Sequence, residues 1–169
     1  MRKSLVISCP ASSRSGYGDH SRDLIKSLIA MDKFDMQVMD QRWGNCPRTG
    51  LEGNTEISNL IMPKGQQLQS QPDIWIQVTV PNEFQAVGRF NIGVTAGIEG
   101  NVKNVISSKK PIHVLFEGLN LDVFDKKEDA QFQGIEHIPE SFCFLVVGHW
   151  LQGDFGQDRK DLAGTLKTF

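Results

Sequence analysis

The sequence predicts an α/β protein built on a parallel β-sheet with flanking helices. Short apolar segments that are typical of buried strands recur at residues 5–9, 73–80 and 90–95. Residues 5–40 run in the order strand, Gly-rich loop, helix and strand, which is the opening of a βαβ unit. The composition is that of a globular protein, because 39% of the 169 residues are hydrophobic and the formal net charge is −2.

Periodicity and turn residues predict the elements one by one. In chain order they are a strand at 5–9, a loop at 10–18, a helix at 19–31, strands at 36–40, 56–62 and 73–80, a turn or short helix at 81–84, strands at 90–95 and 112–116, a polar connector at 120–140, a strand at 142–147, a Gly-rich loop at 148–158 and a helix at 159–169. Asp19 or Ser21 is the expected cap of the first helix. The last three elements repeat the opening, so a second Rossmann-like unit is predicted to begin near residue 141.

Composition and spacing also exclude several classes of protein. The charge balance lacks the basic excess of a general nucleic-acid binder. The apolar runs are shorter than a membrane span, and the one near the basic start is too short for a signal peptide. Cys9, Cys46 and Cys143 fit neither a zinc pattern nor a disulfide framework, and the four His residues are scattered. We therefore expect a soluble cytoplasmic protein with reduced thiols, no metal and no membrane span.

The first Gly-rich segment, Ser15-Gly16-Tyr17-Gly18, precedes the first predicted helix. A helix N-terminus leaves backbone N–H groups unpaired and carries partial positive charge, and a Gly-rich loop lets a phosphate approach it closely. The segment therefore predicts a phosphate site. The alternative is a tight turn between strand and helix.

A dinucleotide-binding turn is a rival interpretation of the same segment. Asp40 stands about twenty residues after Gly18, where a ribose-binding acid is found in such enzymes. Ser21 stands where a third glycine is expected, and residues 10–16 make the loop longer than a dinucleotide turn. The sequence therefore disfavours an oxidoreductase.

The second Gly-rich segment ends in two adjacent cations, Arg159 and Lys160, at the start of a predicted helix. Cations there oppose the helix dipole, but a bound anion reverses the sign of that effect. Arg offers bidentate hydrogen bonds to phosphate and Lys a point charge. The alternative is a solvated surface patch in which Asp158 and Asp161 neutralise the two cations locally.

In their order along the chain, several segments resemble group 1 glycosyltransferases of the two-Rossmann-domain (GT-B) type, especially members from bacteriophages and marine microbes. The segments that carry the resemblance are residues 15–24, residues 72–84 with 91–99, residues 114–124, which are similar to the interdomain NGVDxxxF segment, and residues 144–148 with 158–162 and 168–169. The resemblance implies a Rossmann-like acceptor-side domain at 1–118, a connector at 119–140 and an incomplete donor-side domain at 141–169.

The chain departs from the family pattern at two places. Residues 100–110 span a gap in which the family has a helix, a strand and another helix, so the first domain is shortened. The part of the second domain that holds the donor's base and ribose in the family is absent from the sequence. A second copy of the chain or another protein is therefore an expected partner. For a phage-encoded chain, the expected compartment is the host cytoplasm.

The resemblance implies sugar transfer from a nucleotide-sugar donor to a hydroxyl acceptor, without a metal or other cofactor. The alternative is a non-catalytic remnant that binds a sugar phosphate, a nucleotide or a protein. Cations and backbone dipoles would stabilise the leaving diphosphate. The candidate residues are, for the diphosphate, Arg159, Lys160, Gly16, Tyr17 and Gly18; for acceptor binding or base catalysis, His20 and Glu99; and for the acceptor side, Glu83. His20 as a helix-surface residue and Glu99 as an ordinary loop carboxylate are the alternatives.

Overall fold

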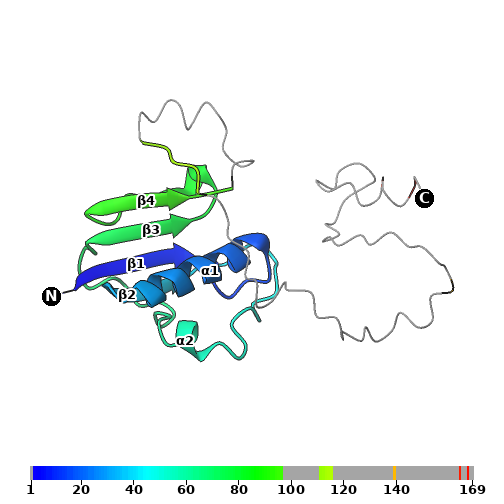
Figure 1. The fold of residues 1–169 in the computed structure, drawn as a ribbon, viewed down its shortest axis with the longest axis horizontal. Coiled ribbons are helices and arrows are strands. Elements are labelled where there is room, and N and C mark those ends of the chain that lie inside the picture. The colour runs from blue at the N-terminus through cyan, green and yellow to red at the C-terminus, as the bar shows by residue number, and fades with distance from the viewer. Residues whose placement is uncertain (1, 97–110, 116–138, 140–163, 165–166, 168–169) are drawn as a thin grey trace. The chain divides into compact units, whose positions relative to one another are not determined.

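The computed structural model describes residues 2–96, 111–115, 139, 164 and 167 of the chain. The chain divides into two compact units, Met1–Gly118 and Leu119–Phe169. The elements named below all belong to the first unit, and Figure 1 shows their arrangement. In chain order they are β1 (Lys3–Cys9), α1 (Gly16–Met31), β2 (Phe34–Asp40), α2 (Thr55–Ser58), β3 (Ile74–Val78), the 3-10 turn η1 (Pro81–Glu83) and β4 (Phe90–Val94).

Within the described part of the chain, the four strands form one parallel sheet in the order β2-β1-β3-β4. The sheet with its helices confirms the predicted α/β class and is compatible with a Rossmann-like fold. β1 lies between β2 and β3, so the chain crosses from one side of β1 to the other after β2. In the register, Ser8 of β1 is the partner of Gln77 of β3.

Helix α1 begins at Gly16, three residues before the predicted start. Ser15 is the N-cap, in an extended conformation, and its side chain accepts a hydrogen bond from the Gly18 N–H at 3.1 Å. The prediction of Asp19 or Ser21 as the cap is therefore wrong. Ser15 already accepts a hydrogen bond from a backbone N–H of the first turn, so the helix includes Gly16 and Gly18. The helix ends at Met31, and its C-cap Asp32 adopts a left-handed conformation with φ 47°.

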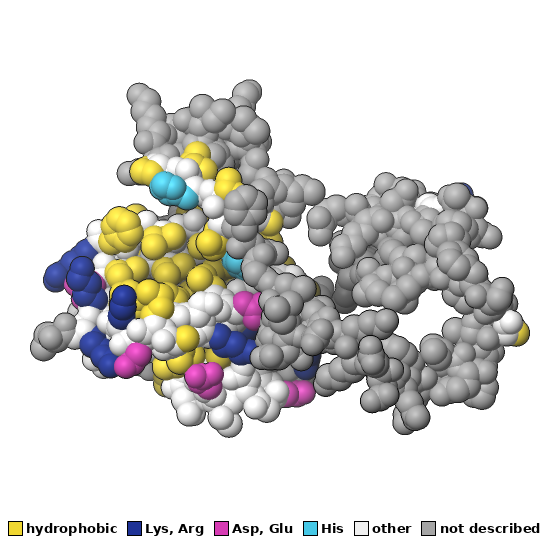
Figure 2. Space-filling model, in the orientation of Figure 1, with side chains coloured by type: hydrophobic (Ala, Val, Ile, Leu, Met, Phe, Trp, Pro, Cys, Tyr) yellow, Lys and Arg dark blue, Asp and Glu magenta, His cyan; other side chains and the backbone are white. Residues whose placement is uncertain are grey.

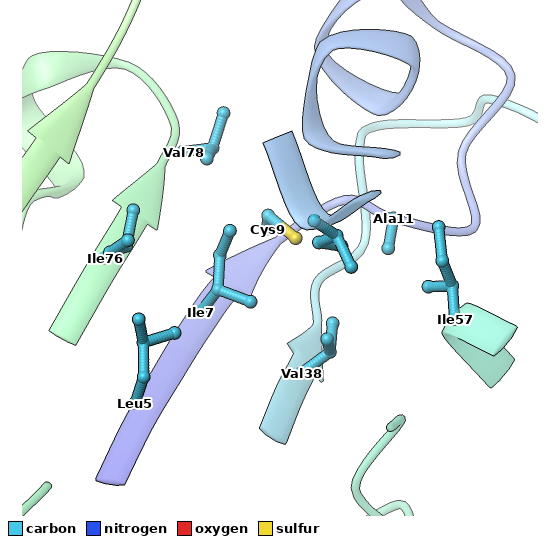
Figure 3. Packing of buried hydrophobic residues seen from close by; sticks show 9 residues of the cluster. Leu5, Ile7, Cys9, Ala11, Val38, Ile57, Ile76 and Val78 are labelled. Atoms are coloured by element: carbon cyan, nitrogen blue, oxygen red, sulfur yellow. The ribbon is translucent and has the colours of Figure 1, made fainter. Parts of the chain in front are cut away.

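The main core lies between α1 and the sheet. Leu5, Ile7 and Cys9 alternate along β1 toward this face, as a period of two requires. Ile25 of α1 is fully buried with them, and Ile57 brings α2 into the same cluster. Figure 3 shows these strand side chains gathered on one side of the sheet. This burial positions α1 over β1.

A second, smaller cluster covers the opposite face of the sheet. Val6, Met62 and Trp75 are its buried members, with Met39, Leu68 and Val87 packed around them. The prediction that Trp75 is a core residue is confirmed, since its side chain is 3% exposed. Polar side chains replace this apolar cluster toward the carboxyl ends of β1 and β3, where Ser8 and Gln77 lie opposite each other.

Two predicted strands are absent from the described residues. Residues 56–62 hold α2 and a single parallel bridge between Ile61 and Val38, because Asn54 caps a helical turn there. The described residues 111–115 form no strand, and the side chains of Val114 and Leu115 are 80% and 65% exposed. A strand needs a paired neighbour and a buried face, and these residues have neither among the described part of the chain.

Apolar side chains are also exposed over the sheet edge. Phe90 and Ile92 of β4 are 62% and 38% exposed on the α1 side of the sheet, where α1 does not reach them. Figure 2 shows apolar side chains gathered over β3 and β4. None of the helices formed by the described residues is long and apolar enough to span a membrane.

Candidate functional site

The candidate site lies at the carboxyl ends of β1 and β3. These two strands are parallel neighbours, and the chain leaves them in opposite directions, toward β2 from β1 and toward β4 from β3. In open parallel α/β sheets, ligands bind in the crevice where the connections diverge in this way. The topology therefore directs attention to the loops that follow Cys9 and Val78.

Two open cavities lie there, with volumes of about 320 Å³ and 230 Å³. The residues that line both are Ser8, Gln41, Gln77 and Glu83. The larger cavity adds Met39, Trp75 and Gln85; the smaller adds Pro10, Arg42, Trp43, Val78 and Thr79. Most of the polar lining consists of amides and hydroxyls, which donate and accept hydrogen bonds without carrying charge.

Side-chain amides fix the wall on the β3 side of the cavities. Gln77 donates from Nε2 to the Glu83 carbonyl at 3.0 Å, and its Oε1 accepts from the Gln85 N–H at 2.8 Å. Thr79 donates its hydroxyl proton to the Glu83 carboxylate. Pro81 begins the intervening turn, where its fixed φ suits a helical start. The Glu83 side chain is thereby held at the rim of both cavities.

Asp40 fixes the loop that follows β1. Its carboxylate accepts from the Ser12 N–H at 3.0 Å, from the Ser12 hydroxyl at 2.6 Å and from Arg48 at 2.6 Å. The Asp40 side chain is 9% exposed. A dinucleotide enzyme needs this acid directed at the start of the helix near Gly18. Because the Asp40 carboxylate is already bonded to Ser12 and Arg48, the geometry gives the oxidoreductase interpretation no support.

Arg22 holds the same loop from the helix side. This side chain of α1 is buried, and its Nη1 donates to the carbonyls of Ala11 and Ser13 at 2.7 and 2.8 Å. It also pairs with Asp19, one turn earlier. The buried Arg22 side chain therefore holds the loop after β1 against the start of α1.

The glycines of the helix start differ in their surroundings. The Gly18 N–H is bonded to Ser15, and a Cβ at Gly18 would overlap the Ser13 carbonyl oxygen. Gly18 is thus required for close packing of α1 on the loop. A Cβ at Gly16 would meet no atom within 4 Å, so the backbone there borders open space.

Tyr17 connects the helix start to the end of β4. Its ring stacks on Trp43 with centroids 4.3 Å apart. Its hydroxyl lies 3.0 Å from the Thr95 hydroxyl and accepts from the Ala96 N–H at 3.2 Å. Through Trp43, which lines the smaller cavity, Tyr17 borders the candidate site.

Replacing Tyr17 by Phe tests this connection. The variant keeps the ring on Trp43 but loses the hydroxyl. We therefore expect the free energy of unfolding, measured with urea, to fall by about 1 kcal/mol. Amide exchange at Ala96, followed by NMR, is expected to accelerate. Unchanged exchange at Ala96 would contradict the role assigned to the hydroxyl.

Cys9 lies beneath the site and has no nucleophilic role. Its thiol is fully buried, and burial raises its pKa to about 12, so it stays protonated at neutral pH. We expect iodoacetamide at neutral pH to alkylate the half-buried Cys46 in the native protein and Cys9 only in denaturant. Peptide mapping by mass spectrometry checks this, and native alkylation of Cys9 at the rate of Cys46 would refute it.

The sequence-predicted site residues are only partly gathered at this site. Glu83 lines both cavities, whereas His20, half-buried in the second turn of α1, lines neither. Glu99, Arg159 and Lys160 lie outside the described residues. The described residues contain no group of three His, Cys, Asp or Glu side chains that would hold a metal ion.

Sequence reasoning missed Ser8, Gln41, Gln77 and Gln85. A signal for two of them was present, because Ser8 and Gln77 interrupt otherwise apolar strands near their carboxyl ends. A polar residue at that place is needed for neither strand propensity nor core packing. The pairing of β1 with β3 was required to show that the two side chains meet.

Comparison with family models, with curated proteins and with solved structures finds no match to this chain.

Proposed function

We propose that this chain is a glycosyltransferase-like protein in which residues 1–118 form the acceptor-side domain of a sugar transfer from a nucleotide-sugar donor to a hydroxyl. The observation that supports the proposal most is the pair of open cavities where the β1 and β3 connections diverge, lined in common by Ser8, Gln41, Gln77 and Glu83. Uncharged hydrogen-bonding groups with one carboxylate match the chemistry of a hydroxyl acceptor.

In this proposal Glu83 acts on the acceptor. Its exposed carboxylate accepts the proton of the attacking hydroxyl, and the Thr79 hydroxyl holds that carboxylate in place. Gln77 fixes the turn that carries Glu83. The donor's diphosphate would be stabilised by Arg159 and Lys160, as the family resemblance implies.

The proposal is tested first by thermal unfolding of the full chain with UDP, GDP, ADP and their sugar conjugates. A ligand at 100 times its dissociation constant adds about 2.7 kcal/mol to the stability of the folded state. We expect one nucleotide to raise the Tm selectively and Arg159→Ala to abolish that rise. A response to none of the nucleotides would reject the transferase in favour of the non-catalytic remnant.

Activity is tested by release of the nucleoside diphosphate in the presence of a hydroxyl acceptor. We expect Glu83→Gln to slow this release about a hundredfold or more while the nucleotide-induced Tm rise persists. The matched control is Glu52→Gln, an exposed carboxylate that lines neither cavity. Equal rates for both variants would remove Glu83 from the mechanism.

A further inference from the structure

The larger cavity is distinguished by what lines it. Four of its seven lining side chains, those of Ser8, Gln41, Gln77 and Gln85, are neutral hydrogen-bonding groups, and none of the seven is a cation. Glu83 contributes the one negative charge. An anionic ligand would meet this carboxylate without a compensating positive group in the lining of the larger cavity, since Arg42 lines the smaller one and donates to Gly44 and Asn45. The larger cavity therefore disfavours phosphorylated and carboxylated molecules.

The amides are positioned before any ligand arrives. Gln77 is bonded at both ends of its amide, and Gln41 donates from Nε2 to the Ser8 hydroxyl oxygen at 3.0 Å. Because Ser8 accepts that bond, its own proton can be donated to a ligand oxygen. Groups fixed in this way lose little conformational freedom on binding, which favours a specific ligand.

Trp75 supplies an aromatic side chain to the lining. Its ring lines the cavity and is 3% exposed, and its indole N–H has no hydrogen-bond partner in the described part of the chain. The Nε1 atom is itself closed to solvent, so Trp75 contributes its ring to the lining and not a hydrogen-bond donor.

We infer that the larger cavity selects an uncharged, hydroxyl-rich ring of the size of a single sugar. A volume of about 320 Å³ is at the lower end of the range for ligand pockets, which suits one ring. Ring hydroxyls bond to Gln41, Gln77 and Ser8, and one of them meets Glu83. The inference rests on the proposed function, since this ring is the acceptor in that reaction, and it restricts the acceptor to a neutral one.

The test measures binding of neutral and anionic monosaccharides to the full chain by saturation-transfer NMR. The probes are glucose, galactose, mannose and N-acetylglucosamine, each compared with glucose 6-phosphate and glucuronic acid. We expect at least one neutral sugar to bind and both anions to bind about tenfold more weakly or not at all. Equal binding of neutral and anionic sugars, or binding of the anions alone, would overturn the inference.

Variants separate the cavity from the rest of the surface. Gln41→Leu keeps the side-chain size and removes the amide, so we expect about tenfold weaker binding of the neutral sugar. Gln37→Leu in β2, four positions before Gln41, is the matched control, since Gln37 lines neither cavity. Glu83→Gln is expected to admit glucose 6-phosphate. An equal loss from Gln41→Leu and Gln37→Leu would overturn the inference, as would unchanged exclusion of the anion by Glu83→Gln.

The two proposals fail in different ways. Binding of a neutral sugar that is sensitive to Gln41→Leu, without a response to any nucleotide, supports the cavity assignment and rejects the transferase. A nucleotide response without neutral-sugar binding supports the transferase and overturns the cavity assignment. Fluorescence of Trp75 in a chain with Trp43→Phe and Trp150→Phe gives a second readout, and we expect the neutral sugar to change it.

Discussion

Gly18→Ala is expected to lower the free energy of unfolding by about 3 kcal/mol, at the upper end for overpacking. The added Cβ would overlap the Ser13 carbonyl oxygen and lie 3.0 Å from its carbonyl carbon. These are backbone atoms that cannot rotate away, so α1 or the loop must shift. Urea denaturation followed by circular dichroism measures the loss.

Gly16→Ala is the matched control for this substitution. It places the same methyl group two residues earlier in the same helix, where a Cβ meets no atom within 4 Å. We expect its stability to lie within about 0.5 kcal/mol of the parent, because alanine is also the better helix former. Equal losses from the two variants would show that the packing described at Gly18 is wrong.

Arg22→Met is expected to destabilise the chain by a similar amount, about 3 kcal/mol. The substitution removes a buried guanidinium and leaves the carbonyls of Ala11 and Ser13 without their donor. Met preserves much of the side-chain volume, so the loss reports the hydrogen bonds rather than a cavity. Thermal and urea unfolding both measure it.

Arg14→Met is the control, because the Arg14 side chain is exposed and, among the described residues, donates its hydrogen bonds to Thr49, while its backbone bond to Pro47 is kept in the variant. We expect it to change stability by about 0.5 kcal/mol or less. Limited proteolysis gives a second readout, since Arg14 lies in the loop that Arg22 holds and trypsin cleaves after it. Cleavage at Arg14 is expected to accelerate in Arg22→Met, and unchanged cleavage would contradict the locking role.

The sequence was sufficient for the four strands of the sheet, but it also predicted strands at 56–62 and 112–116 that the described residues do not form, and it misplaced the start of α1. The apolar run at 5–9 and the alternation at 36–40 predicted β1 and β2, because burial on a sheet imposes a pattern that is visible locally. The start of α1 was predicted three residues too late, because its first three residues are Gly16, Tyr17 and Gly18, and glycines favour a loop. Ser15 decides that boundary through one hydrogen bond to Gly18.

The site was harder to predict than the fold because it depends on pairing. Gln77 and Ser8 are nearly seventy positions apart, and the strand order that joins them is not written in either strand. Asp40 is the reverse case, because its spacing from Gly18 suggested a contact with a ligand. In the folded chain it bonds Ser12 and Arg48, a use that the spacing does not distinguish from binding a ribose.

The alternation of β1 has a consequence for how such a protein evolves. Leu5, Ile7 and Cys9 face the main core, while Ser8 between them faces the cavity. A substitution at Ser8 therefore alters the cavity without opening a void under α1, whereas one at Ile7 does the reverse. Under the proposed function, ligand preference and folding stability are encoded at alternate positions of a single strand, so selection can diversify one while it conserves the other.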